Sequence, residues 1–394
     1  MALAALVFIA LAAFAAALLW APHAGRPAAL HLILAVGAMP LIFGAMSHFI
    51  PVLTRTRIAT SGLLGIPVLA LAGGALAVGS LSLTELFWGR YAGALLALAA
   101  AGALLVWSRR RRAGMLGRPH PCLAWYEAAL ACLVLALLAI LASAVWPQQT
   151  IAFYRLHLHL NTLGFVGLTA VSTLAVLLPT VAGRPDPQVG PRLRRDLPWA
   201  LAGTLLVAVG SAWFGPLAWI GGALWAVPLL RLGASWLRLY RAEILALHGA
   251  APLLAAALAG LALSMILGAA APITAPITAP ITVAPLTAAG WFRPAEPALA
   301  FVSGFMLPLV SGAASQLLPV WLRPGVQSSW HTKLRDSLGR YGGVRAALFC
   351  LGGIAAGTGH EWGLLLGAAT LIWFLLQAGG ALLQAFIFQK RNPS

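Results

Sequence analysis

Charged side chains are scarce in this chain of 394 residues. Only 8% of its residues are Asp, Glu, Lys or Arg, whereas a soluble domain typically carries about 25%. Apolar residues make up 61% of the sequence, so there are too few polar side chains to cover a water-facing surface. The composition therefore excludes a soluble enzyme, a disordered protein and a nucleic-acid-binding protein. It predicts an integral membrane protein whose main partner is the lipid bilayer.

Acidic residues are the rarest charged residues. Eight Asp and Glu stand against 25 Lys and Arg, which gives a formal net charge of +17. In a membrane protein, an excess of basic residues in short loops sets the orientation of the chain. Carboxylates are nearly absent from the apolar segments, which excludes a di-iron carboxylate site and a calcium site.

Cysteine is also rare. The three cysteines, Cys122, Cys132 and Cys350, lie in or beside apolar runs and show no C-x-x-C spacing. Neither a disulfide framework nor a zinc site is therefore expected.

Long apolar runs are abundant instead. A helix needs about 20 apolar residues to cross the hydrocarbon core of a bilayer. Twelve segments of the chain approach this length and are predicted to be membrane spans. They are residues 2–20, 29–51, 61–83, 89–108, 123–146, 152–179, 197–214, 217–239, 247–270, 298–319, 341–359 and 362–388.

The basic residues divide unequally between the two sides of this predicted arrangement. Twenty of the 25 lie at the ends of even-numbered spans or in the loops that follow them. Arg26, Arg90, Arg155 and Arg293 lie on the other side, and Arg345 lies inside a span. By the positive-inside rule, both termini are expected in the cytoplasm, with the chain in the inner membrane of a bacterium.

Three of the predicted spans resemble one another in sequence. Each of them ends in a proline that is followed four or five residues later by an arginine. The segments are residues 31–55, 159–184 and 299–323, and they belong to the second, sixth and tenth spans. The predicted fold class is therefore an all-α polytopic membrane protein with 12 transmembrane helices in three parallel, pseudo-symmetric four-helix repeats. The predicted repeats are residues 1–119, 120–246 and 247–394, the third with a low-complexity outer loop at 272–297.

Alignment of the repeats singles out four polar positions. A shift of 128 residues places His31 on His159, and a shift of 268 places His48 on Gln316. Seventeen residues of helix separate His31 from His48 by about 25 Å, so the two cannot share a metal. His48 and Gln316 form a second candidate polar site, because an ionisable group inside a membrane is a functional candidate. A hydrogen bond between helices is the alternative role for both.

Three histidines, His31, His157 and His159, lie near the outer ends of predicted spans. Imidazole suits haem iron and copper, so these residues are candidate cofactor and metal ligands. Residues two apart on a helix point about 200° apart, so His157 and His159 are expected to serve two centres. Arg155 is a candidate partner for a haem propionate. The alternative is a group of interfacial histidines bonded to loop carbonyls, beside an ordinary surface arginine.

Twelve helices in parallel repeats, with outer histidines on the second and sixth spans, resemble the catalytic subunit of the haem–copper oxidases. The closer resemblance is to haem- and copper-containing membrane proteins of the NnrS type, which are linked with nitric-oxide stress. The resemblance implies haem b as a cofactor and copper as a further one. It also implies that His31 ligates a low-spin haem, because the oxidases carry a ligand histidine on the second span.

Other features depart from the oxidase pattern. The span at 197–214 has no histidine, and no two histidines are adjacent in the chain. The oxidases carry their H-x-H on the tenth span, whereas RLHLHLN of this chain lies on the sixth. The implied role is therefore redox or gas chemistry under nitric-oxide or copper stress, with a quinol or cytochrome as electron donor. Proton-pumping oxygen reduction is not expected, enzymatic activity stays open, and no catalytic residue is assigned.

Two other functions are consistent with the sequence. Spans rich in Gly and Pro in parallel repeats are also typical of a transporter that carries no cofactor. The scarcity of carboxylates inside the spans disfavours an ion-coupled version of that function. An assembly subunit of a respiratory complex is the third interpretation.

Overall fold

A computed structural model describes residues 2–20, 26–56, 61–115, 117–270 and 296–391. Within these ranges every regular element is a helix. In this part of the chain, eleven helices are long and apolar enough to cross a membrane, and the prediction of an all-helical, multi-pass membrane protein is confirmed at that level. Arg293 lies outside the described residues, as does the predicted low-complexity loop at 272–297 except for its last two residues.

The elements are α-helices, three π-helical segments and three short 3-10 segments. The π-helical segments are η1 (Leu32–Ala38), η5 (Leu160–Gly167) and η6 (Phe301–Met306). The 3-10 segments are η2 (Ser61–Leu64), η3 (Thr84–Leu86) and η4 (Pro147–Gln149). The α-helices are α1 (Ala2–Trp20), α2 (Arg26–His31), α3 (Met39–Thr54), α4 (Gly65–Ser82), α5 (Gly89–Ala113), α6 (Cys122–Val145), α7 (Thr150–His159), α8 (Leu168–Val181), α9 (Val189–Trp213), α10 (Gly215–Leu239), α11 (Arg241–Ile244), α12 (Ala251–Ala270), α13 (Pro297–Ala300), α14 (Leu307–Leu322), α15 (Ser329–Gly339), α16 (Gly342–Gly357) and α17 (Trp362–Arg391).

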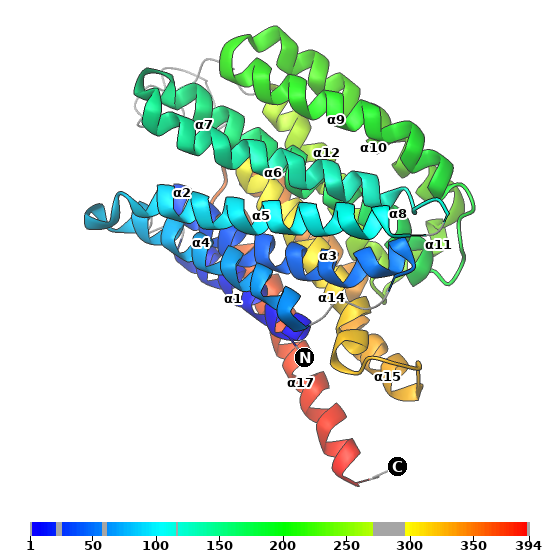
Figure 1. The fold of residues 1–394 in the computed structure, drawn as a ribbon. Helices are drawn as coiled ribbons and strands as arrows, with labels where there is room; N and C mark the ends of the chain where they lie inside the picture. Colours follow the sequence, from blue (N-terminus) through cyan, green and yellow to red (C-terminus); the bar gives the residue numbers. More distant parts are fainter. Residues whose placement is uncertain (1, 21–25, 57–60, 116, 271–295, 392–394) are drawn as a thin grey trace, which may run out of the picture. The chain divides into compact units, whose positions relative to one another are not determined.

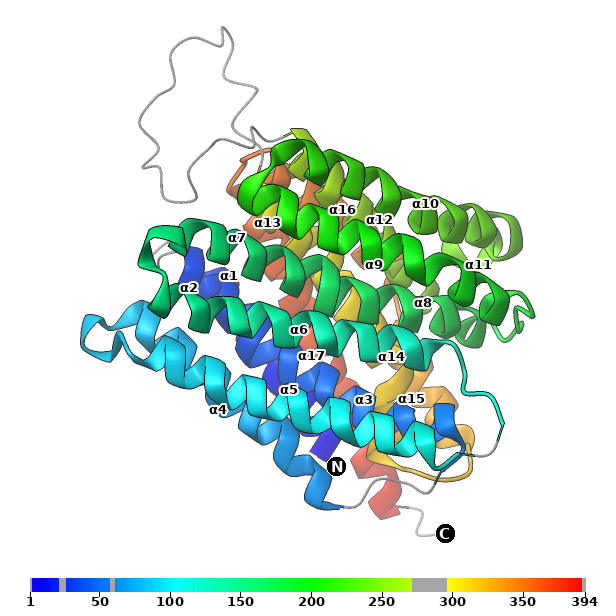
Figure 2. The ribbon, with the colours of Figure 1, turned by 45° about the horizontal axis from the view of Figure 1, so that its top comes forward.

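The amino-terminal unit comprises residues 2–176 and 186–231. Its helices α4, α5 and α6 run side by side (Figures 1 and 2), α1 packs on η1, and α7 packs on α9. Glycines bring α4 and α5 together, because a Cβ on Gly73 would lie 2.7 Å from the Gly93 carbonyl oxygen. The reverse contact, from a Cβ on Gly93 to the Gly73 oxygen, would be 2.5 Å. Small residues therefore let these backbones touch, as is common between membrane helices.

The carboxy-terminal unit comprises residues 177–185 and 232–394. Three of its elements, α12, η6 and α16, pack on one another. A Cβ on Gly260 of α12 would lie 1.9 Å from the Gly304 carbonyl oxygen of η6. A Cβ on Gly353 of α16 would lie 2.5 Å from the Gly304 Cα. Three glycines thus meet where three helices contact one another.

The predicted span at 341–359 corresponds to α16, which has 16 residues. Such a helix is about 24 Å long, less than the roughly 30 Å of a typical hydrocarbon core. The described residues therefore contain eleven helices of spanning length, and the predicted total of twelve is not established by them.

Two local predictions differ from the structure. The predicted span at 197–214 is only the C-terminal part of α9, which begins at Val189 and so includes a polar first segment. An ion pair of 3.0 Å between Arg192 and Asp186 lies at this extended end. The segment around 329–339 is helix α15 rather than loop, and it begins with a reciprocal capping box between Ser328 and His331. The capping residues satisfy backbone groups that a helix end leaves free.

Side chains from three helices hold the C-terminal end of α15. The Leu338 carbonyl accepts hydrogen bonds from Ser315 Oγ at 3.2 Å and from Arg345 Nη2 at 2.6 Å. Gln377 Nε2 donates to the carbonyls of Ser337 at 2.5 Å and Leu338 at 3.3 Å. The last carbonyls of a helix have no partner within the helix. These bonds therefore give a structural role to Arg345, whose side chain is completely buried in α16.

Replacing Gln377 with leucine is expected to loosen α15. The change removes the side-chain donor to the Ser337 carbonyl and one of three side-chain donors to the Leu338 carbonyl. A lost buried hydrogen bond typically costs about 1–3 kcal/mol. Local opening of α15 should then rise about tenfold, measurable as faster tryptic cleavage after Lys333 or Arg335. Gln384→Leu is the control, because Gln384 is exposed on the same helix. Equal cleavage rates in the two variants would contradict this role for Gln377.

Candidate functional site

Two of the predicted ligands, His31 and His157, lie together in the amino-terminal unit. His31 is the last residue of α2, and His157 lies in the last turn of α7. Their ring centroids are 6.1 Å apart, and the ring planes are within 7° of parallel. Both side chains are half-buried. The pair is the most direct contact between candidate metal ligands in the described part of the chain.

Backbone carbonyls orient both rings. The Nδ1 atom of His31 lies 2.8 Å from the Pro27 carbonyl oxygen, and that of His157 lies 3.0 Å from the Ala136 oxygen. A carbonyl can only accept, so each Nδ1 carries the proton and each Nε2 keeps its lone pair. Metal-bound histidines usually have this arrangement, in which the second nitrogen is free to ligate.

The separation of the rings also fits a metal ion between them. A nitrogen–metal bond is about 2 Å long, so two imidazoles on opposite sides of one metal have centroids roughly 6 Å apart. The observed 6.1 Å matches this value. Offset stacking of two aromatic rings gives centroids about 4.5–7 Å apart as well, so the 6.1 Å separation agrees with both arrangements.

A π-helical segment follows each of the candidate ligands. Segment η1 begins directly after His31, and η5 begins directly after His159. The start of η1 maps onto the start of η5 by a shift of 128 residues, and the end of η1 maps onto the end of η6 by a shift of 268. These are the same shifts that align the three similar spans in sequence. π-Helical turns inside α-helices often mark functional sites.

Asn161 braces the first turn of η5. Its Nδ2 donates a hydrogen bond of 2.9 Å to the His157 carbonyl oxygen. The same atom lies 3.2 and 3.3 Å from the two ring nitrogens of His157. The amide therefore sits over the ring and limits its rotation.

His159 takes no part in the ring pair. Arg155, one turn earlier on the same helix, donates from Nη1 to the Ser211 carbonyl oxygen of α9 at 3.2 Å. The His159 ring makes no hydrogen bond within the described residues. His157 contacts α6, whereas Arg155, one turn before His159, contacts α9. The two histidines of HLH therefore lie on different sides of the helix.

Arg90 is a further cation near this end of α7, and the sequence did not single it out. Its Nη1 lies 3.3 Å from Tyr154 Oη, and its guanidinium stacks 4.8 Å from the centre of the Tyr91 ring. Tyr154 precedes His157 by one turn. Neither Arg90 nor Arg155 forms an ion pair with a carboxylate in the described part of the chain. Both guanidinium groups therefore keep a positive charge that an anionic group could neutralise.

His48 and Gln316, the second predicted polar pair, belong to different units. His48 is half-buried on α3, with its ring edge against Phe49 at 5.2 Å. Gln316 lies on α14 and lines a cavity of the carboxy-terminal unit. The prediction that they act together stays a prediction.

The described residues contain no group of three or more His, Cys, Asp or Glu side chains placed to hold a metal ion. A two-histidine site suits haem iron, since the porphyrin supplies the remaining four ligands. Copper in a protein site ordinarily needs more than two protein ligands. Two histidines thus match the number of protein ligands in a haem site better than that in a copper site.

Other histidines stabilise loops. Tyr341 donates its backbone N–H to His248 Nδ1 at 3.0 Å, and Cys122 donates to His120 Nδ1 at 3.3 Å. Burial, together with the nearby charge of Arg194, lowers the pKa of His120. The neutral ring is the form that can accept this bond, so the shift agrees with the contact.

Comparison of the chain with protein families, with curated proteins and with solved structures gives no match. The fold and composition alone define its class, a multi-pass, all-helical membrane protein. The resemblance to haem–copper oxidases and to proteins of the NnrS type stays a prediction from the sequence.

Proposed function

We propose that the protein binds one b-type haem through His31 and His157 and acts as a redox protein of the bacterial inner membrane. The observation that carries the proposal is the near-parallel pair of imidazoles with centroids 6.1 Å apart. Both rings are held through Nδ1 by backbone carbonyls, so each Nε2 carries the lone pair that would bind iron. The Nε2 atom of His157 also lies 3.3 Å from Asn161 Nδ2, which would have to move aside. Haem, when bound, supplies one-electron redox chemistry.

The neighbouring residues have defined roles in this proposal. The carbonyls of Pro27 and Ala136 fix the tautomers and raise the basicity of the ligand nitrogens. Asn161 holds the His157 ring in place. Arg90 and Arg155 offer positive charge to the propionates at the outer end of the site, where no carboxylate in the described residues competes for them.

Two histidine ligands leave no free coordination position on iron. Such a site favours electron transfer over substrate binding at the metal. A quinol or a cytochrome is the corresponding class of electron donor. A role under nitric-oxide or copper stress remains the expectation that the sequence resemblance adds, with copper as a further cofactor of that role.

We also infer the twelve-span topology with three four-helix repeats and cytoplasmic termini. The matching offsets of η1, η5 and η6 support the repeats. In this topology α16 is a short span, and the basic loops face the cytoplasm. Exposed Trp88, Trp146 and Trp213 lie beside the outer ends of spans, as interfacial aromatics do.

The test is the absorption spectrum of the full-length protein, purified in detergent after expression with a haem precursor. We expect a Soret band, split α and β bands on reduction with dithionite, and about one haem per chain by pyridine haemochromogen assay. Low-spin signals in electron paramagnetic resonance would report two histidine ligands. A colourless preparation would refute the proposal and favour the transporter or assembly subunit.

A further inference from the structure

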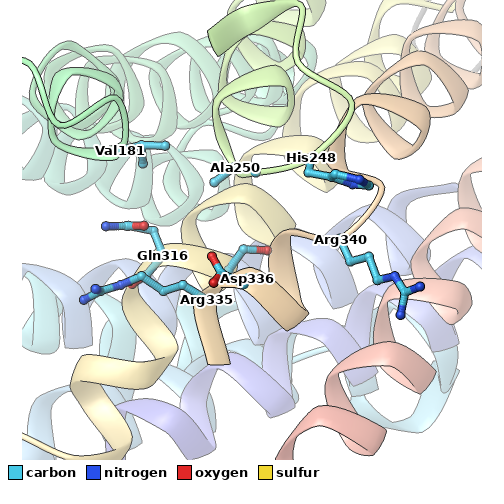
Figure 3. Close-up of a pocket in the computed structure, with 9 residues that line it drawn as sticks. Val181, His248, Ala250, Gln316, Arg335, Asp336 and Arg340 are labelled. Atoms are coloured by element: carbon cyan, nitrogen blue, oxygen red, sulfur yellow. The ribbon is translucent and has the colours of Figure 1, made fainter. Parts of the chain in front are cut away.

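The carboxy-terminal unit contains a cavity of about 430 Å³ that the haem proposal does not use. Six polar side chains line it, from the loop before α12, from α14, and from α15 and the residue that follows it. They are His248, Ser315, Gln316, Arg335, Asp336 and Arg340. Figure 3 shows Gln316, Arg335 and Asp336 gathered on one side of the cavity and His248 and Arg340 on the other.

The cavity lies where membrane spans end. Val181, which lines it, is the last residue of the candidate span Pro147–Val181. Ala250, also in the lining, directly precedes the candidate span Ala251–Ala270. The ends of spans are at the depth of lipid headgroups. Polar groups of the cavity are therefore level with the phosphate and amine groups of a bilayer.

The lining combines opposite charges that do not neutralise each other. Arg335, Asp336 and Arg340 form no ion pair within the described residues. Arg335 donates Nε to the Gln316 carbonyl at 3.4 Å and Nη2 to Gln327 Oε1, both neutral acceptors. The Asp336 carboxylate has no hydrogen-bond partner in the described part of the chain. Two cations and one anion around a cavity are complementary to a ligand that carries both a phosphate and an amine.

Exposed apolar side chains lie next to the lining residues in the sequence. Leu245 and Leu247, three residues and one residue before His248, are 70% and 54% exposed. Tyr341 and Val344, which follow Arg340, are each 37% exposed. Such side chains offer a surface to acyl chains, which a soluble phosphate ester does not have.

We propose that this cavity binds a phosphoethanolamine group, and that its source is the headgroup of a membrane phospholipid. Arg335 and Arg340 attract the phosphate, and Asp336 accepts the ammonium group. Gln316 supplies a neutral acceptor or donor beside them. The proposal is independent of haem binding, since it concerns residues of the other unit.

The test is native mass spectrometry of the purified full-length protein in mixed micelles. The micelles contain phosphatidylethanolamine or phosphatidylglycerol with identical acyl chains. We expect retention of phosphatidylethanolamine over phosphatidylglycerol by about fivefold, in line with a partly exposed ion pair. Asp336→Asn should remove this preference, and Arg335→Gln should lower retention of both lipids. Lys333→Gln is the matched control, because Lys333 is an exposed cation of α15 outside the lining.

Equal preference in the Asp336→Asn and Lys333→Gln variants would overturn the proposal. Circular dichroism of each variant shows that a loss of binding does not reflect unfolding. Titration with soluble phosphoethanolamine distinguishes the two sources. Displacement of the lipid only by a large excess of this ester supports the lipid as ligand, whereas equal affinity for the ester would overturn it.

Discussion

Alanine in place of His31 or His157 is expected to remove most of the haem from the purified protein. Each residue supplies one of only two protein ligands in the proposed site, so a single replacement leaves iron with one. Loss of even an outer-shell partner commonly costs tenfold to a hundredfold in metal affinity, and loss of a ligand should cost at least as much. The measurement is haem per chain, together with the split α band of the reduced protein.

Two further variants make this result specific. His159→Ala should keep the split α band, because His159 lies outside the ring pair. His360→Ala is the control for the loss of a histidine near the end of a span. His360 is far from the site along the chain, and its Nδ1 lies 3.1 Å from Thr358 Oγ1. Wild-type haem content and spectra in both the His31 and His157 variants would rule out these ligands.

Gly260→Ala is expected to destabilise the carboxy-terminal unit strongly. The added methyl group would lie 1.9 Å from the Gly304 carbonyl oxygen, a backbone atom that cannot move without shifting η6. Overpacking of this kind typically costs about 1–3 kcal/mol and occasionally more. We expect a lower Tm in detergent and less monodisperse protein by fluorescence-detected size-exclusion chromatography.

Gly380→Ala provides the matched comparison. A Cβ at Gly380 of α17 meets no atom within 4 Å. Alanine favours a helix over glycine by about 1 kcal/mol, so this variant should be as stable as the wild type or slightly more stable. The same chemical change is thus expected to act in opposite directions at the two positions. Equal Tm values for both variants would show that the glycine contact does not limit packing.

Much of the fold follows from the sequence, because apolar length is a strong signal. The predicted span 2–20 coincides with α1, and the predicted span 217–239 differs from α10 by two residues at one end. Helix α15 was not predicted, because its 11 residues include Lys333, Arg335 and Asp336 and so resemble a polar loop. Its capping box pairs Ser328 with His331, and not with the Glu or Gln that marks this motif in a sequence.

The candidate site could be predicted only in part. HLH and the repeat alignment indicated His31, His157 and His159, since histidine is rare in apolar spans. Which two of them meet depends on the rotation of each helix, and π-helical turns change that rotation without a clear sequence pattern. The carbonyls that orient the rings belong to Pro27 and Ala136. Every residue type has a backbone carbonyl, so the sequence does not indicate which of them contacts a ring.

The widened turns of η1, η5 and η6 have a consequence for how such spans can change in length. A π-helical bond closes from residue i to i+5, so each widened turn takes up one residue more than an α-turn. In an uninterrupted α-helix, inserting or deleting one residue swings everything beyond it by about 100°. Here a widened turn can gain or lose that residue locally. The part of a span before the π-helical segment, which carries the histidines, can therefore change its orientation during evolution independently of the part after it, which carries glycines.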